Sequence, residues 1–183
     1  MGTPASGTTG IVLAAGAGTR AGGPKALFRM PDGTPWLELA CAFLTDSGCD
    51  RVVAVLGAGE RIARPLVPAT AEVLVAADWE AGMSASLRAG LAAASGGAVL
   101  ITLVDLPELP ASVGRRVMAG SGPLRQATYA GAPGHPVFIA QDHWEPVAAS
   151  LSGDRGARRY LVENSVSEIE CGDLWNGLDR DLG

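Results

Sequence analysis

Two cations stand in a glycine-rich stretch near the start of the chain, between Gly16 and Lys25. Glycine lets backbone N–H groups approach an anion closely, and Arg20 and Lys25 add the fixed positive charge that exposed amides lack. The apolar run directly before this stretch, Ile11 to Ala15, is typical of a buried strand. The sequence therefore predicts a phosphate-binding loop at the carboxyl end of a strand.

Two other glycine loops fit this spacing poorly. A Walker loop requires Gly-Lys-Ser/Thr, but Lys25 lies between Pro24 and Ala26. A dinucleotide fingerprint is met only in its permissive form, Gly-x-Gly-x-x-Ala from Gly16, and it requires an acidic residue at the end of the next strand. The next predicted strand, residues 51–56, is followed by Gly-Ala-Gly without a carboxylate. Neither motif explains why the loop continues to an arginine and a lysine.

A carboxylate that could bind a metal follows a second apolar run, residues 98–104. Asp105 stands where ligands bind in open α/β sheets, at the carboxyl end of a central strand, and Pro107 prevents the strand from continuing. Mg²⁺ prefers oxygen ligands and is commonly held by one or two carboxylates together with phosphate oxygens and water. We therefore predict that Asp105 binds Mg²⁺. The structural alternative is that Asp105 caps a helix beginning near Pro110.

Strands and helices are predicted to alternate along most of the chain, which indicates an α/β fold. We expect three Rossmann-like layers, with a mostly parallel central sheet covered by helices on both faces. Besides the strands over 11–15, 51–56 and 98–104 already named, the patterns predict strands over 72–76, 126–130, 136–140 and 165–170, and helices over 34–47, 60–66, 111–118 and 143–149. Residues 131–136 are expected to form a loop.

Composition limits the possible functions. The 183 residues, 48% of them hydrophobic, predict a single domain (1–183) with a flexible leader at 1–9. A net charge of −5 argues against nucleic acid or an anionic membrane as partner. The chain shows neither a signal peptide nor an apolar run long enough to span a bilayer, so we expect a cytoplasmic protein. Cys41, Cys49 and Cys171 lack the spacing of a metal site and are expected to be buried thiols.

The segment Leu13-Ala14-Ala15-Gly16-x-Gly18-x-Arg20-x-Gly22-x-x-Lys25 resembles the signature of the MobA-like NTP-transferase family, which includes the molybdenum cofactor cytidylyltransferases. In that family the loop wraps the triphosphate of an NTP. The resemblance implies a nucleotidyltransferase fold in which Arg20, Lys25 and Asp105 are catalytic. It also implies that five loop residues bind the nucleotide: Leu13, Ala14, Ala15, Gly16 and Gly18.

A later segment resembles the Trp-x-x-Gly-Met-x-x-Ser-Leu-x-x-Gly pattern of the cytidylyltransferases, which lies beside the base and the ribose. It implies nucleotide-binding roles for Gly82, Met83 and Ser86. The alternative is an ordinary amphipathic helix with a serine cap, in which Met83, Leu87 and Leu91 form an apolar stripe. The resemblance to the same family as the first loop favours the nucleotide site.

Four segments resemble the family's metal and acceptor regions. The Asp-x-Pro at Asp105 matches the aspartate that holds the metal, and the last aspartate of Asp-Arg-Asp implies a second ligand, Asp181, although the usual Thr-Pro and following helix are missing. A Gly-x-Pro-x-His-Pro loop and a Gly-Asp-x-Gly-Ala-Arg segment imply an acceptor pocket with His135, Asp154 and Arg158. Alternatively, His135 only bonds backbone, and the second segment is a capped helix start with solvated arginines.

The resemblance implies a Mg²⁺-dependent nucleotidyltransferase. It would transfer an NMP, with CTP the favoured donor, to a phosphorylated small-molecule acceptor such as molybdopterin, and release pyrophosphate. An ionised phosphate nucleophile needs no general base, in keeping with the lack of a convincing base near these loops. Sugar-phosphate and other small-acceptor nucleotidyltransferases share the loop. An NAD(P)H-dependent reductase on a similar scaffold and a nucleotide-binding module without catalysis also stay open.

Overall fold

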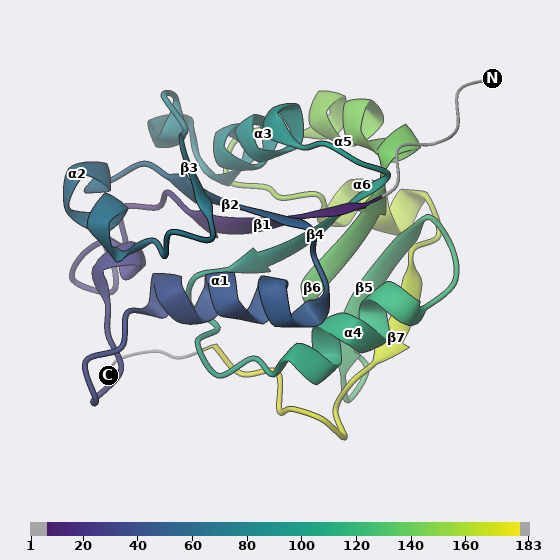
Figure 1. The fold of residues 1–183 in the computed structure, drawn as a ribbon. Helices are drawn as coiled ribbons and strands as arrows, with labels where there is room; N and C mark the ends of the chain where they lie inside the picture. Colours follow the sequence, from purple (N-terminus) through teal and green to yellow (C-terminus); the bar gives the residue numbers. More distant parts are fainter. Residues whose placement is uncertain (1–6, 180–183) are drawn as a thin grey trace.

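A seven-stranded sheet forms the centre of the computed structural model, which describes residues 7–179 (Figure 1). The strand order is β3-β2-β1-β4-β6-β5-β7. Strand β6 runs antiparallel to both of its neighbours, and the other described strand pairs are parallel. The strands are β1 (Thr8–Ala14), β2 (Arg51–Leu56), β3 (Glu72–Val75), β4 (Ala98–Leu103), β5 (Leu124–Tyr129), β6 (Ala132–Ala140) and β7 (Ser167–Glu170).

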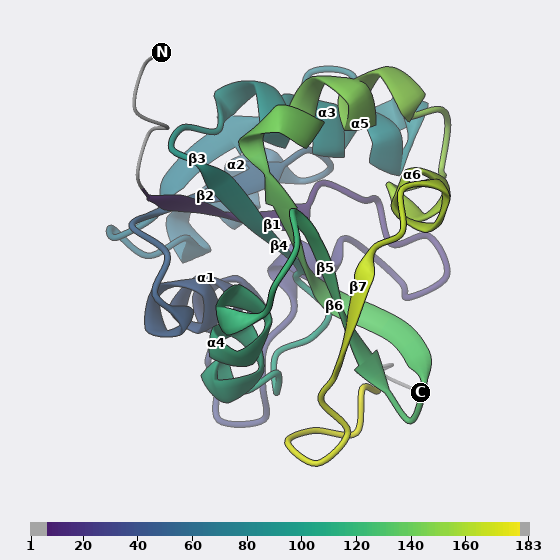
Figure 2. The same ribbon diagram turned by 90° about the vertical axis from the view of Figure 1, so that its right-hand side faces the viewer.

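Helices cover both faces of this sheet, as Figures 1 and 2 show. Helices α1 and α4 lie against one face, and α3, α5 and α6 lie against the other. The α-helices are α1 (Trp36–Ser47), α2 (Glu60–Ala63), α3 (Met83–Ala93), α4 (Ala111–Ala119), α5 (Trp144–Ser150) and α6 (Arg158–Glu163). The structure thus confirms the prediction of a three-layer α/β fold with a mostly parallel sheet.

Strand β1 is buried on both faces, because successive side chains point into different core clusters. Ile11 faces α3, and Val12 faces α1. Glycines allow the helices to approach closely: a Cβ on Gly90 of α3 would lie 3.0 Å from Ile11 Cγ2, and a Cβ on Gly10 would lie 2.9 Å from Leu44 Cβ of α1. The strand that leads into the glycine-rich loop is therefore clamped between two helices.

The order of the strands reverses between β1 and β4. From β1 the chain proceeds to β2 and β3 on one side, and then β4 pairs with the other edge of β1, with Leu13 opposite Leu103. In open α/β sheets, ligands bind outside the carboxyl ends of the strands at such a switch point. The fold thus places the loop after β1 and the residues after β4 at one potential binding site.

The amino-terminal part of the chain differs from the prediction of a flexible leader over residues 1–9. Thr8 and Thr9 belong to β1, where Thr8 pairs with Ala98 and the Thr9 hydroxyl donates to the Ser95 carbonyl at 2.7 Å. Residues 1–6 lie outside the described part. Because Thr8 and Thr9 are small and polar, the sequence pattern did not indicate that they belong to a strand, whose partners come from distant parts of the sequence.

The predicted loop at 131–136 is wrong, because β6 already begins at Ala132. Ala130 and Gly131 form a tight turn with positive φ angles of 51° and 77°, so that Tyr129 pairs with Ala132 directly after it. Glycine and two prolines made this segment resemble a loop in sequence. The pairing with β5 nevertheless continues as a strand with an irregularity between Gln126 and Thr128.

The cysteines are free and buried, as predicted. Burial raises the pKa of both the Cys41 and the Cys49 thiol to about 12, since a thiolate is poorly solvated in the core. None of the helices within residues 7–179 has the length and apolar character that crossing a bilayer requires.

Candidate active site

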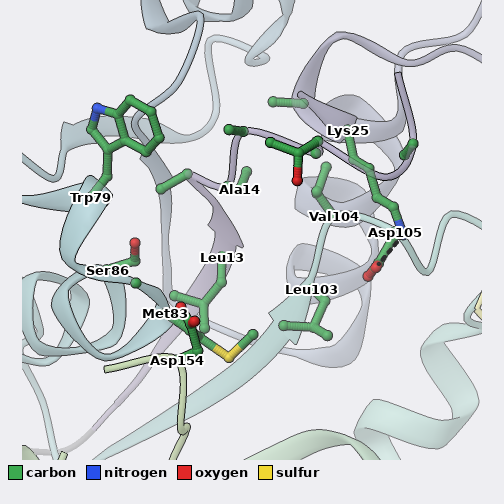
Figure 3. A pocket seen from close by; sticks show the side chains of 18 of the residues that line it. Leu13, Ala14, Lys25, Trp79, Met83, Ser86, Leu103, Val104, Asp105 and Asp154 are labelled. Atoms are coloured by element: carbon green, nitrogen blue, oxygen red, sulfur yellow. Dashed lines mark hydrogen bonds and ion pairs between the residues drawn. The ribbon is translucent and has the colours of Figure 1, made fainter. Parts of the chain in front are cut away.

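A cleft of about 950 Å³ opens at the carboxyl ends of β1 and β4 (Figure 3). One wall is the glycine-rich loop after β1, and the other comes from the residues before and within the start of α3. Twelve of the predicted site residues line it: Leu13, Ala14, Ala15, Gly16, Gly18, Arg20, Lys25, Gly82, Met83, Ser86, Asp105 and Asp154. Segments far apart in the sequence therefore share one cavity.

Lys25 and Asp105 meet on one side of this cleft (Figure 3). The Lys25 ammonium donates to Asp105 Oδ2 at 3.0 Å, and the two side chains are only 24% and 18% exposed. The other carboxylate oxygen, Oδ1, is buried and has no hydrogen-bond partner within the described residues. Asp105 does not cap α4, which begins after Pro110 without a side-chain cap. An unsatisfied buried carboxylate oxygen of this kind is a suitable ligand for a hard cation.

The glycine-rich loop is folded tightly around one carbonyl. The Gly18 carbonyl accepts hydrogen bonds from the amides of Ala21 at 2.9 Å and Gly23 at 3.1 Å. Gly18 has a φ of 59°, and a Cβ at this position would collide with the Gly23 carbonyl. Arg20 lies exposed at the cleft and makes no ion pair with another described residue. The loop thus holds its shape through glycine and presents a guanidinium.

The opposite wall combines an indole, a thioether and a hydroxyl, from Trp79, Met83 and Ser86 (Figure 3). Gly57 provides the space for Trp79: a Cβ on Gly57 would lie 2.6 Å from Trp79 Cγ and 2.7 Å from the Ala15 carbonyl oxygen. Sequence reasoning missed Trp79 as a site residue, although it belongs to the quoted family segment. An aromatic and apolar wall of this kind suits a flat ring more than a second phosphate.

Met83 lies at the cleft and does not continue an apolar stripe of α3, which was the alternative interpretation of this segment. Leu87 and Leu91 are buried in the core as expected, but Met83 is 43% exposed and lines the cleft. The serine cap is also absent, because α3 begins at Met83 after Gly82 without a side-chain cap. The spacing of the three apolar residues does not distinguish a core position from a position at the cleft, where the first residue of α3 lies.

Asp154 reaches the cleft because its loop rests on the start of α3. Gly82 has a φ of 102°, and a Cβ there would collide with the Asp154 carboxylate and the Gly153 backbone. The Ser84 amide donates to the Gly153 carbonyl at 3.1 Å and ties the two segments together. The Asp154 side chain is exposed at the cleft, beside Met83 in Figure 3.

The other two predicted acceptor residues do not line the cleft. His135 is half-buried within β6, where burial lowers its pKa to about 4 and the negative charge of Asp105 partly opposes this shift. Arg158 begins α6 and is exposed. Asp181 lies outside the described residues, but Asp179, which sequence reasoning did not select, lines the cleft. Of the three predicted acceptor residues, Asp154 lines the cleft, and His135 and Arg158 do not.

The described residues supply few metal ligands. Among residues 7–179, no group of three or more histidine, cysteine, aspartate or glutamate side chains is arranged to hold a metal ion. Asp105 and Asp179 nevertheless line the same cleft. Such a donor set fits Mg²⁺, which commonly takes one or two carboxylates and completes its shell with phosphate oxygens and water.

Comparison with known proteins identifies the family. The model of the MobA-like NTP transferase domain matches residues 10–168, which run from within β1 through α6 to the start of β7. The chain belongs to this family. The match spans the glycine-rich loop, Asp105 and the Asp154 segment, so the observed cleft consists almost entirely of residues within the family domain.

Two relatives, one of them known from two structures, are similar to this MobA-like chain over nearly its whole length. "Nicotine blue oxidoreductase" of Paenarthrobacter nicotinovorans is 36% identical, covering 94% of this chain and 91% of that protein. Rv0371c from Mycobacterium tuberculosis H37Rv has a TM-score of 0.83 at 26% identity, covering 97% and 94% of the two chains. A second Rv0371c structure, a complex with manganese, has a TM-score of 0.76 at 25% identity, covering 91% and 89%.

The inositol-1-phosphate CTP transferase from T. maritima shares the fold. Its TM-score is 0.76 at 18% identity, covering 99% of this chain and 94% of that chain.

Proposed function

We propose that this MobA-like protein transfers a nucleoside monophosphate from an NTP to a phosphorylated small molecule and releases pyrophosphate. The observation that carries the proposal is the convergence of Lys25 and Asp105 at 3.0 Å in the cleft that the glycine-rich loop borders. A cation for phosphate and a carboxylate for a metal are the two elements that this chemistry needs side by side.

The glycine-rich loop and Arg20 bind the triphosphate in this proposal, and Lys25 neutralises phosphate charge. A phosphate oxygen of the acceptor forms a bond to the α-phosphorus, while the bond from that phosphorus to the bridging oxygen breaks and pyrophosphate takes the electron pair. The chain positions two anions that repel each other and offsets the charge of the leaving group. An ionised phosphate carries no proton to remove, so the neutral His135 need not act as a base.

Asp105 would hold Mg²⁺, with Asp179 as a further carboxylate in the cleft. The bound metal supplies positive charge to the phosphate oxygens. The buried, unpaired Oδ1 of Asp105 supports this assignment. So does the manganese in a structure of the relative Rv0371c.

CTP is the favoured donor, and a molybdopterin-type phosphate is the favoured acceptor. The support is the likeness of the Leu13 to Gly16 segment and of the Gly82 to Leu87 segment to the cytidylyltransferase branch, and both segments line the cleft in part. One structural neighbour is named an inositol-1-phosphate CTP transferase. Sugar phosphates and other small phosphorylated acceptors are therefore to be tested alongside molybdopterin.

The test is pyrophosphate release from each of the four NTPs, with and without Mg²⁺, in the presence of molybdopterin or a panel of sugar and polyol phosphates. We expect release that requires Mg²⁺ and an acceptor and is fastest with CTP. A thermal-shift panel of the same NTPs supports the assay, because a ligand at 100 times its Kd stabilises a protein by about 2.7 kcal/mol. Failure of every NTP to bind in the presence of Mg²⁺ would rule the proposal out.

A second candidate is an NAD(P)H-dependent reductase, favoured by the relative named nicotine blue oxidoreductase. The end of β2 counts against it, because Gly57 to Gly59 follow the strand where a ribose-binding carboxylate is expected. Oxidation of NADH or NADPH with a dye as electron acceptor, followed by absorbance in excess EDTA, separates the two functions. Hydride transfer that continues in EDTA supports the reductase, and nucleotidyl transfer that stops in EDTA supports the transferase.

A further inference from the structure

The last described residues, 171–179, return from the end of β7 to the cleft, and we call them the C-terminal strap. The strap begins at the buried Cys171, whose amide donates to the Thr128 carbonyl of β5 at 2.8 Å. Asp173 then forms an ion pair with Arg116 of α4. In Figure 1 the strap is the yellow segment that runs from β7 back across the lower part of the view. It ends at Asp179, which lines the cleft.

Tyr129 forms a fixed platform under the middle of the strap. Tyr129 is 7% exposed, and its hydroxyl donates to the His135 carbonyl at 2.6 Å. Trp175 packs edge-on against the Tyr129 ring, with 5.3 Å between the ring centroids and an interplanar angle of 84°. Such a pair contributes about 0.5–1.5 kcal/mol beyond the area it buries. The strap is therefore docked by a specific aromatic contact.

Gly177 brings the backbone of the strap directly onto the same ring. Its φ is 74°, and a Cβ at this position would lie 2.5 Å from Tyr129 Cγ and 2.7 Å from Tyr129 Cβ. No other residue type fits without moving the strap or the buried ring. Two residues of extended chain span at most about 7 Å, so the docking of Gly177 limits where Asp179 can lie.

We propose that Tyr129, Trp175 and Gly177 are positioning residues that dock the C-terminal strap and thereby hold the Asp179 carboxylate in the cleft that contains Asp105. The inference rests on the proposed function, because it assigns Asp179 to the binding of a divalent metal with a polyphosphate. The buried, unpaired Oδ1 of Asp105 is the second carboxylate oxygen available to such a metal. The strap acts only through Asp179, and its three docking residues touch neither phosphate nor metal.

A matched pair of glycine variants tests the docking. Gly177→Ala and Gly131→Ala place the same side chain at φ angles of 74° and 77°, but only the former meets the Tyr129 ring, since nothing lies within 4 Å of a Cβ on Gly131. Mn²⁺ affinity is measured by electron paramagnetic resonance in the presence of the non-hydrolysable α,β-methylene analogue of CTP. We expect Gly177→Ala to weaken Mn²⁺ binding about 10–100-fold, as loss of residues that orient metal ligands does, and Gly131→Ala to leave it unchanged.

A second pair covers the case in which Gly177→Ala does not fold. Trp175→Phe keeps an aromatic edge for Tyr129 and should retain most of the Mn²⁺ affinity, whereas Trp175→Ala should lose it. Asp179→Asn should reproduce the loss of Mn²⁺ affinity without disturbing the docking of the strap on Tyr129. Adding Trp175→Ala to Asp179→Asn should weaken binding no further, because both changes act on one carboxylate. Affinity for the CTP analogue without metal should not fall in any of these variants.

The outcomes separate this inference from the function on which it rests. If the wild-type protein binds Mn²⁺ with the CTP analogue and Gly177→Ala and Trp175→Ala bind equally well, the strap inference is wrong and the proposed function stands. Additive losses from Trp175→Ala and Asp179→Asn overturn the inference as well. If the wild-type protein binds no Mn²⁺ in the presence of any NTP analogue, both the inference and the proposed function are overturned.

Discussion

The Lys25 ammonium and the Asp105 carboxylate lie 3.0 Å apart although 80 residues separate them in the sequence. The contact brings together the end of the loop after β1 and the first polar residue after β4. In the described structure these opposite charges neutralise each other. We expect a polyphosphate to bind Lys25 and a metal ion to bind Asp105. The predictions below follow from this contact and from the loops around it.

Replacement of either cation of the phosphate loop should abolish turnover while the fold persists. Loss of a comparable arginine in phosphoryl transfer lowers the rate about 10³–10⁵-fold, and we expect losses of this order for Arg20→Ala and Lys25→Ala. Measurement of kcat for pyrophosphate release checks the prediction, with Arg159→Ala as a control on the exposed face of α6. An unchanged kcat would remove these residues from the mechanism.

Asp105→Asn should abolish pyrophosphate release, and Mg²⁺ should no longer increase the stabilisation of this variant by nucleotide. The amide keeps the size of the side chain but loses the charge that attracts both Mg²⁺ and Lys25. Mg²⁺ titrations of pyrophosphate release and of nucleotide-induced stabilisation measure both effects. Wild-type activity in excess chelator would contradict the role of Asp105.

Two glycines of the loop should respond differently to alanine. Gly18 and Gly22 both have positive φ angles, 59° and 82°, but only a Cβ on Gly18 collides with backbone, at the Gly23 carbonyl. Both variants incur the cost of a left-handed alanine, about 1–3 kcal/mol, and Gly18→Ala must also open the loop. We expect the Kd of Gly18→Ala for NTP, measured by calorimetry, to be at least tenfold higher than that of Gly22→Ala. Equal Kd values for the two variants would show that NTP binding does not require this loop geometry.

Glu170 should make stability depend on pH in the acidic range. Its carboxylate accepts hydrogen bonds from the amides of Gly172, Gly131 and Ala130 and from the Thr128 hydroxyl, and these bonds hold its pKa below the ordinary value. A carboxyl group with a lowered folded-state pKa stabilises the fold fully above its unfolded pKa, about 4.3, and this contribution is lost as the pH falls through the folded pKa.

The matching variant is Glu170→Gln, which removes the charge and keeps the length of the side chain. Its Tm should lie below that of the wild type at pH 7, and the difference should shrink as the pH falls below about 4. Thermal unfolding followed by circular dichroism between pH 3 and pH 8 gives the comparison. A Tm difference that is constant over this range would show that the charge of Glu170 makes no pH-dependent contribution.

The sequence alone determined most of the strands and helices and the pairing of a phosphate-binding loop with a carboxylate. Apolar runs such as Ala98 to Leu103 require burial on both faces, and this local pattern already indicates a parallel sheet. Glycines, two cations and an aspartate directly after strands are local features as well. The rule that ligands bind at the carboxyl ends of strands then predicts that Lys25 and Asp105 share a site.

Only the tertiary structure decided which side chains enter the cleft. Met83 turns toward it while Leu87 is buried, Trp79 fits there because Gly57 leaves space, and His135 lies in β6 outside the cleft lining. These placements depend on contacts between segments far apart in the chain, which residue spacing does not encode. Asp179 is the clearest case, because its position results from the packing of the strap on Tyr129, 50 residues earlier in the sequence.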